Sequence, residues 1–261
     1  MHALHDIWRP NGRVSPRVRR ALAVGTIVAL FAVWACRPAF LPGPLDIIKA
    51  LPNLVAQGLF EQLYSSLSTC LEAIGITCLL TLPLAYLTVL PAVRPFVRIL
   101  SKLRFLGLTG FVVLFTIAFG GGHGLKIALL VFGMSVFLIT SLYDVVEAIP
   151  REAFDHARTL RMGPWTTVLE VVVFGQMAAV LDIIRQNSAM GWAMLGIAEG
   201  LVRFEGGLGA MMLTEDKHIR LDSVFAIQLV VLFIGIALDW TWLLVRKTLC
   251  PFADITLERQ E

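Results

Sequence analysis

The sequence predicts an all-α membrane protein that crosses the bilayer about six times. Of its 261 residues, 57% are apolar and only 16% are charged, and the mean hydropathy is +0.78. Soluble domains contain about a quarter charged residues, so this composition is far outside the soluble globular range. The apolar residues also fall into separate runs, most of them near the roughly 20 residues that a helix needs to cross a bilayer.

Six apolar runs define the expected spans, and together they form a single transmembrane domain over residues 21–247. An N-terminal tail (1–20) and a C-terminal tail (248–261) flank this domain. The expected spans are residues 21–36, 66–90, 105–120, 125–142, 177–201 and 224–245. The run at 105–120 is short, so we expect it to tilt little, to use flanking residues, or to cross only in part.

The distribution of basic residues orients these spans. With an even number of spans the two tails lie on one side, and most Lys and Arg residues fall in segments on that side. Positive charge concentrates in cytoplasmic loops, so both tails are expected in the cytoplasm. The basic N-terminus and the apolar run after it also resemble a signal peptide, but Arg37-Pro38 follows instead of a small-residue cleavage site. We therefore expect an uncleaved first span.

A polar stretch, residues 147–176, lies between the fourth and fifth expected spans. Glu152 is placed where an acid favours a helix N-terminus, and Gly163-Pro164 is typical of a helix end followed by a new helix. Between them, apolar residues recur at helical spacing: Ala153, Ala157 and Leu160. A short amphipathic helix of this kind can lie on the lipid surface, act as a solvated connector, or fit a groove on a partner protein.

This stretch resembles the EAA loop of permease subunits from ATP-binding-cassette (ABC) importers. The resemblance is carried by Glu152-Ala153, by Ala157-Arg158-Thr159-Leu160 and by Gly163. In that family the loop forms a coupling helix that docks into the cytoplasmic ATPase. The resemblance implies that the following residues couple this chain to the ATPase: Glu152, Ala153, Asp155, Ala157, Leu160 and Gly163. Two positions depart from the family pattern, because Arg161 replaces the usual glycine and Val173-Phe174 replaces the usual Leu-Pro.

The fifth expected span, residues 177–201, is the most polar one. Arg185, Trp192 and Glu199 are seven residues apart and therefore share one helix face. Asp182 lies one turn before Arg185, close enough to pair with it. Such residues either form structural ion pairs or line the path of a polar or anionic solute. The candidate pathway residues are Arg185, Asn187, Trp192 and Glu199.

Other segments extend the resemblance over most of the chain. They are Leu41-Pro42-Gly43-Pro44, the Arg185, Trp192 and Glu199 pattern, and Gly206-Gly207-Leu208-Gly209 with Asp222-Ser223 before the last span. They resemble the permease branch for nitrate, sulfonates, taurine and bicarbonate. The resemblance implies a small anionic solute and a homodimer of permeases in the bacterial inner membrane. It also implies cytoplasmic ATPase subunits that bind ATP and Mg²⁺, an extracytoplasmic solute-binding protein, and no cofactor, metal ion or nucleic acid bound by this chain.

Two other classes of function remain as alternatives. A self-contained secondary transporter often contains internal repeats, and the two halves of this chain show no convincing repeat. An intramembrane enzyme needs a nucleophile with its base or a metal-binding H-E-x-x-H motif, whereas the five histidines all fall outside the expected spans. The segment Gly120–Gly124 lacks the spacing of a phosphate-binding loop. The sequence therefore favours a transport subunit over an enzyme.

Overall fold

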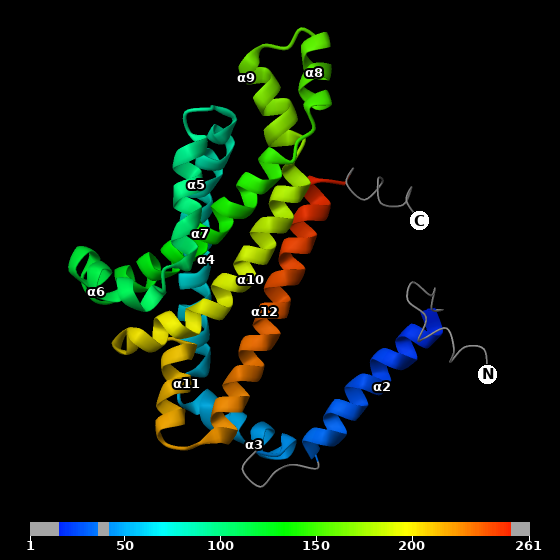
Figure 1. Ribbon diagram of the computed structural model, residues 1–261. Helices are drawn as coiled ribbons and strands as arrows, with labels where there is room; N and C mark the ends of the chain where they lie inside the picture. Colours follow the sequence, from blue (N-terminus) through cyan, green and yellow to red (C-terminus); the bar gives the residue numbers. More distant parts are fainter. Residues whose placement is uncertain (1–15, 36–41, 252–261) are drawn as a thin grey trace.

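The computed structural model describes residues 16–35 and 42–251, and the regular structure within these two ranges is entirely helical (Figure 1). The all-α prediction is confirmed. Most of both expected tails lies outside the described residues, and so does Leu41 at the start of the Leu-Pro-Gly-Pro segment.

Four long helices form the body of the protein. They are α4 (Leu59–Tyr86), α7 (His123–Glu147), α10 (Met177–Leu201) and α12 (Leu221–Leu249). α4 packs along α7, α10 packs on α7, and α12 packs on α10. Their shared core is apolar and includes Cys70, Leu130, Met134, Leu195 and Ile227.

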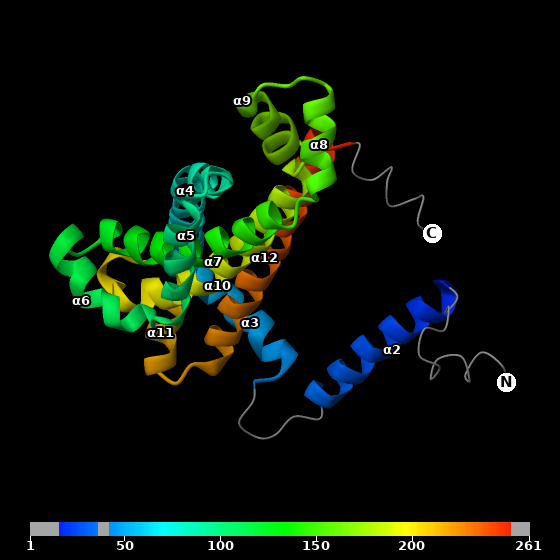
Figure 2. The same ribbon diagram turned by 45° about the horizontal axis from the view of Figure 1, so that its top comes forward.

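Two shorter helices pack at one end of these four. α3 (Pro44–Ala56) lies against α12 and buries one face, whose residues Ile47, Ala50 and Leu54 recur at helical spacing. α11 (Leu208–Lys217) lies against α10 and α12. We call this end of the protein the α11 end. In contrast, α2 (Pro16–Ala35) stands apart from the other helices in both ribbon views (Figures 1 and 2).

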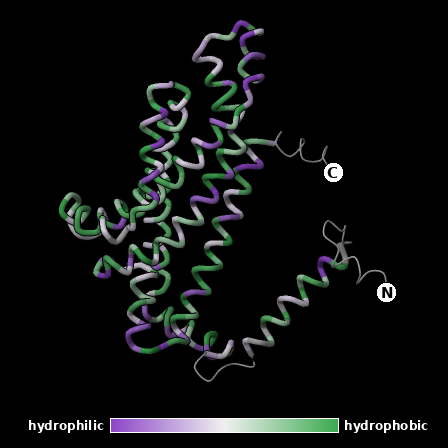
Figure 3. Tube along the Cα trace, in the orientation of Figure 1, coloured by the Kyte–Doolittle hydropathy of each residue, from purple (hydrophilic) through white to green (hydrophobic). Residues whose placement is uncertain are grey.

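The opposite end carries a helical projection, and we call it the α8 end. It is formed by α8 (Arg151–Thr159), α9 (Pro164–Thr167) and η4 (Val168–Phe174), which extend beyond the long helices (Figures 1 and 2). The C-terminal end of α12 lies at this same end. Hydrophilic residues gather at the α8 projection and around α11, whereas the helices between them are mainly hydrophobic (Figure 3).

Fewer helices qualify as membrane spans than the sequence predicts. Three helical segments are long and apolar enough to cross: Leu59–Val89, His123–Glu147 and Leu221–Leu249. The number rises to five if each of two bent helix pairs forms one span, and α2 is not among these segments. The described residues therefore support a multi-pass membrane protein with three to five candidate spans, and they do not confirm six.

The third expected span, residues 105–120, is not one straight helix. Leu106 and Gly107 have extended backbone with ψ of 125° and 136°, and they separate η3 (Leu103–Phe105) from α6 (Leu108–Phe119). The segments on the two sides of this break meet at 114°. The apolar run did not predict this break, because hydropathy alone does not reveal where the backbone leaves the helical conformation.

The expected fifth span coincides with α10, whereas α4 and α7 are longer than the spans predicted from apolar runs. α4 starts at Leu59, directly after Gly58, which has φ +91°. α7 continues to Glu147. Both extensions contain polar residues, so the helices continue past the apolar stretch that marked each span.

α11 approaches α10 closely through two glycines. A Cβ added at Gly209 would overlap the carbonyl oxygen of Gly196, whereas a Cβ added at Gly196 would meet nothing within 4 Å. Only the absence of a side chain at Gly209 allows the start of α11 to approach the Gly196 carbonyl group of α10 this closely.

We therefore expect Gly209→Ala to lower the free energy of unfolding by about 1–3 kcal/mol, because α11 must move away from α10. The measurement is thermal unfolding of the full chain in detergent. Gly196→Ala is the matched control on the facing helix and should leave stability equal or slightly higher, since alanine is the better helix former. Equal losses in both variants would contradict the close approach.

Candidate functional site

α8 ends in a left-handed residue. The N–H groups of Arg161 and Met162 donate to the carbonyl oxygens of Arg158 (2.9 Å) and Ala157 (3.2 Å), which is the Schellman pattern of a helix C-terminus. Arg161 has φ +56°, a conformation that glycine adopts most easily. Arg161, which replaces the glycine of the EAA-loop pattern, is therefore the left-handed residue of this cap.

The six expected coupling residues do not form one exposed surface. Glu152, Asp155, Leu160 and Gly163 are exposed, Ala153 is half-buried, and Ala157 is buried. Asp155 accepts a hydrogen bond from Arg158 at 2.9 Å. The predicted apolar face of Ala153, Ala157 and Leu160 is therefore not uniform, because Ala157 is buried whereas Leu160 is exposed.

Two large apolar side chains are nevertheless exposed among the polar residues of the projection. Leu160 after α8 is 58% exposed, and Trp165 on α9 is 64% exposed. Sequence reasoning missed Trp165, although its position directly after Gly163-Pro164 places it in the first turn of a helix. We call these two exposed side chains, Leu160 and Trp165, the apolar tip of the α8 end.

η4 is the part of the projection that leads into α10. It is a π-helix, which is rare and often marks a functional segment. The segments Pro164–Phe174 and Met177–Leu201 meet at 51°. At this bend a Cβ on Gly175 would lie 2.5 Å from the carbonyl oxygen of Val171, so the bend requires glycine. The projection and α10 are therefore separate segments joined at a bend.

A cavity of about 610 Å³ runs along one face of α10, between α10, α11 and α12. Arg185, Trp192 and Glu199 all line it, so these three predicted residues do share one face. Asn187 is buried but does not line the cavity. The lining is mainly apolar, and α12 adds the polar side chains of Gln228 and Asp239 to it.

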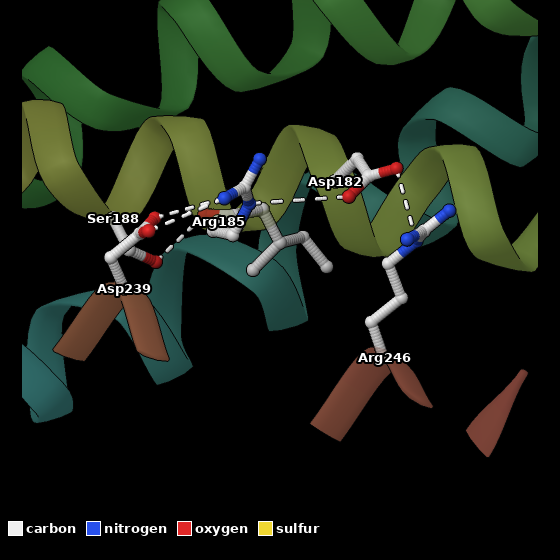
Figure 4. Close-up of polar contacts among 6 residues, drawn as sticks. Asp182, Arg185, Ser188, Asp239 and Arg246 are labelled. Carbon is white, nitrogen blue, oxygen red and sulfur yellow. Dashed lines mark hydrogen bonds and ion pairs between the residues drawn. The ribbon is translucent and has the colours of Figure 1, made fainter. Parts of the chain in front are cut away.

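Four charged residues of α10 and α12 form an alternating chain of ion pairs (Figure 4). Arg185 pairs with Asp239 (Nη1–Oδ1 3.2 Å) and is 4.0 Å (Nε–Oδ1) from Asp182. Asp182 in turn pairs with Arg246 (3.1 Å). The predicted Asp182–Arg185 pair is thus the longest of these three ion-pair contacts. The nearer partners of Asp182 and Arg185 both come from α12. The two positive and two negative charges of these four residues balance. Arg185 itself faces two carboxylates, those of Asp182 and Asp239.

Trp192 adds a third connection between α10 and α12. Its indole N–H donates to the carbonyl oxygen of Val231 at 3.0 Å. A Cβ added at Gly235 would lie 3.2 Å from the indole ring, so α12 leaves room for this ring. Sequence reasoning missed Asp239 because spacing along α10 cannot show which helix faces Arg185.

At the α11 end, the carboxylate of Glu199 is fully buried and caps the N-terminus of α11. Its Oε1 accepts from the Ser66 hydroxyl of α4 at 2.6 Å, and its Oε2 accepts from the Gly209 N–H at 2.8 Å. The Ser66 oxygen accepts from the Leu208 N–H at 2.8 Å. A negative group is favoured at a helix N-terminus, so Glu199 satisfies both its own oxygens and the first turn of α11.

Lys126 of α7 completes this network. Its side chain is 1% exposed, and Nζ donates to the Gly206 carbonyl oxygen at 2.7 Å. Gln62 of α4 accepts from the Gly207 N–H, and a Cβ at Gly207 would overlap the Glu199 carboxylate. The network therefore joins α4, α7, α10 and α11, and Glu199 lines the cavity as part of its framework.

No protein-family model matches this chain, and no curated protein matches it either. Two similar solved structures show inward-facing conformations of the MetNI methionine ABC transporter. The selenomethionine soak crystal form has a TM-score of 0.61 and 12% identity over 73% of this chain and 95% of that chain. The native crystal form has a TM-score of 0.62 and 12% identity over 75% and 97%. This likeness shows that the chain has an ABC transporter permease fold, and at this identity it shows the fold alone.

We expect Arg161→Gly to stabilise the cap of α8 by about 1 kcal/mol, because glycine reaches φ +56° without a Cβ clash. Hydrogen exchange of the amides at 157–162 should slow. Arg158→Gly is the control inside the helix and should accelerate exchange, since glycine there costs about 0.8–1 kcal/mol relative to alanine. Unchanged exchange in Arg161→Gly would contradict the left-handed cap.

We expect Arg185→Gln and Asp239→Asn each to lower the free energy of unfolding by about 1–2 kcal/mol, because each leaves a partly buried charge without its partner. The double variant should lose less than the sum of the single variants. A double-mutant cycle from thermal unfolding measures this coupling. Strict additivity would show that the two residues do not interact.

Proposed function

We propose that this chain is the transmembrane permease subunit of an ABC importer in the bacterial inner membrane. The permease fold supports this proposal, and the projection at the α8 end is the observation that carries it further. The projection extends past the long helices and exposes Leu160 and Trp165. A short helix with an exposed apolar tip suits a groove on a partner protein better than it suits water.

In this proposal the partner at the α8 end is a cytoplasmic ATPase subunit that binds ATP and Mg²⁺. Both termini of the chain are cytoplasmic, and the C-terminal end of α12 lies at the α8 end. The α11 end then faces the outside of the cell, where a solute-binding protein delivers the solute. A second copy of the permease completes a homodimer.

The transport step follows from how α8 is connected to the cavity. ATP binding draws the two ATPases together and moves the projection with them. The movement reaches α10 through η4 and the bend at Gly175, and the ion pairs of Asp182 and Arg185 carry it to α12. Because α10 and α12 both line the cavity, their joint movement changes its access from one side to the other.

The solute proposed here is small. The anionic character of nitrate, sulfonates or bicarbonate rests on the sequence resemblance, because Arg185 is offset by Asp182 and Asp239. The cavity therefore offers no net positive charge from these groups. In this proposal the solute-binding protein selects the solute, and the permease provides a path for it.

We expect Leu160→Asp to weaken association with the ATPase at least tenfold, because it places a charge at the apolar tip. Leu160 is exposed, so the fold should remain intact. The measurement is co-purification of the tagged permease with a cognate ATPase from detergent, followed by ATP-dependent solute uptake in proteoliposomes.

The matched control is Ile219→Asp, which introduces the same charge at the α11 end, where Ile219 is 81% exposed with φ +58°. An aspartate tolerates this conformation, so ATPase association should be unchanged. Equal association of Leu160→Asp and the wild type would contradict the docking role. Solute uptake without any ATPase would favour a self-contained secondary transporter.

A further inference from the structure

A second pocket lies at the α11 end, and it is small and polar. Its volume is about 260 Å³, and its charged or polar lining residues are Gln57, Gln62, Arg203, Thr214 and Glu215. It shares no lining residue with the cavity along α10, because the two spaces lie against different faces of α11. Pockets for drug-sized ligands span roughly 300–1,000 Å³, so this pocket suits a smaller molecule.

Glu215 is the group in this pocket that lacks a sufficient partner. The residue is 4% exposed, and its Oε2 is buried without a hydrogen bond among the described residues. The nearest cation is Arg220, whose Nη1 is 3.6 Å away and whose side chain is 55% exposed. Glu215 also lies near the C-terminal end of α11, where the helix dipole disfavours negative charge. A buried carboxylate oxygen in this position favours a closer hydrogen-bond donor, and a positively charged donor most of all.

Arg203 provides the opposite charge in the same pocket. Its Nε donates to the Gly200 carbonyl oxygen at 3.2 Å, and no carboxylate within the described residues pairs with it. Gln62 uses its Oε1 to accept from the Gly207 N–H, which leaves its amide nitrogen as a donor. The pocket thus offers one acid, one base and amide groups in a small volume.

We propose that this pocket binds a small zwitterion, with an ammonium group at Glu215 and an anionic group at Arg203. The ammonium supplies the close hydrogen-bonded cation that Glu215 lacks, and the anionic group pairs with the free guanidinium N–H groups of Arg203. The proposal does not depend on the transport role, because the pocket is separate from the cavity along α10. Gln62 also contacts the glycine turn before α11, so an occupied pocket would hold that turn in place.

The experiment uses the full chain purified in detergent at low ionic strength and measures its Tm with three zwitterions that differ in charge separation. The probes are glycine, β-alanine and γ-aminobutyric acid, with ethylamine and propionate as single-charge controls. We expect at least one zwitterion to raise Tm by about 3 °C at ten times its Kd, more than either control does. No larger shift with any zwitterion than with the controls would overturn the proposal.

Three variants assign the two charges, and a fourth serves as the control. Glu215→Gln should abolish the zwitterion-induced rise in Tm, and Arg203→Gln should raise the Kd for the zwitterion at least fivefold. Arg220→Gln should preserve or strengthen binding, since Arg220 competes for the same carboxylate. Glu205→Gln, a neighbouring acid outside the pocket, should leave the shift unchanged. A shift that persists in Glu215→Gln would overturn the proposal. If Glu215→Gln does not fold, an unchanged Kd in Arg203→Gln would overturn it instead.

Discussion

A carboxylate with no solvent contact must be fully hydrogen-bonded, and the arrangement of the α11 end depends on how Glu199 meets this requirement. Ser66 and Gly209 satisfy its two oxygens, which brings α4 and the start of α11 against α10. The glycine turn before α11 can approach this closely only because Gly207 and Gly209 have no side chains. One buried acid and a run of glycines therefore determine where three helices meet.

The α10 helix connects the two ends of the molecule. At one end it is held by Glu199, and along its length Trp192, Arg185 and Asp182 bind it to α12. At the other end the bend near Gly175 joins it to the projection. Periodicity alone groups its polar residues together. In the structure, Glu199 belongs to the hydrogen-bond network at the α11 end, whereas Arg185 and Asp182 belong to the ion pairs toward the α8 end.

Periodicity and hydropathy predicted what depends on one helix at a time. The extent of α10, the shared face of Arg185, Trp192 and Glu199, and the helix–turn–helix after Pro150 all follow from local spacing. Contacts between helices could not be predicted in this way. The Asp239 partner of Arg185, the Ser66 partner of Glu199 and the burial of Ala157 depend on which helices lie side by side. The break at Leu106-Gly107 was missed because apolar residues continue across it.

The proposed transport step also implies a scale for the motion of α10 if the buried Glu199 end serves as its pivot. The 25 residues of this helix span roughly 37 Å at a rise of 1.5 Å per residue. With the Glu199 end as a fixed pivot, a rotation of about 10° displaces the Gly175 end by roughly 6 Å over that length. The same rotation displaces Trp192, which lies nearer the pivot, by only about 2 Å. A rotation of this size would thus displace the α8 projection more than it displaces the residues that line the cavity.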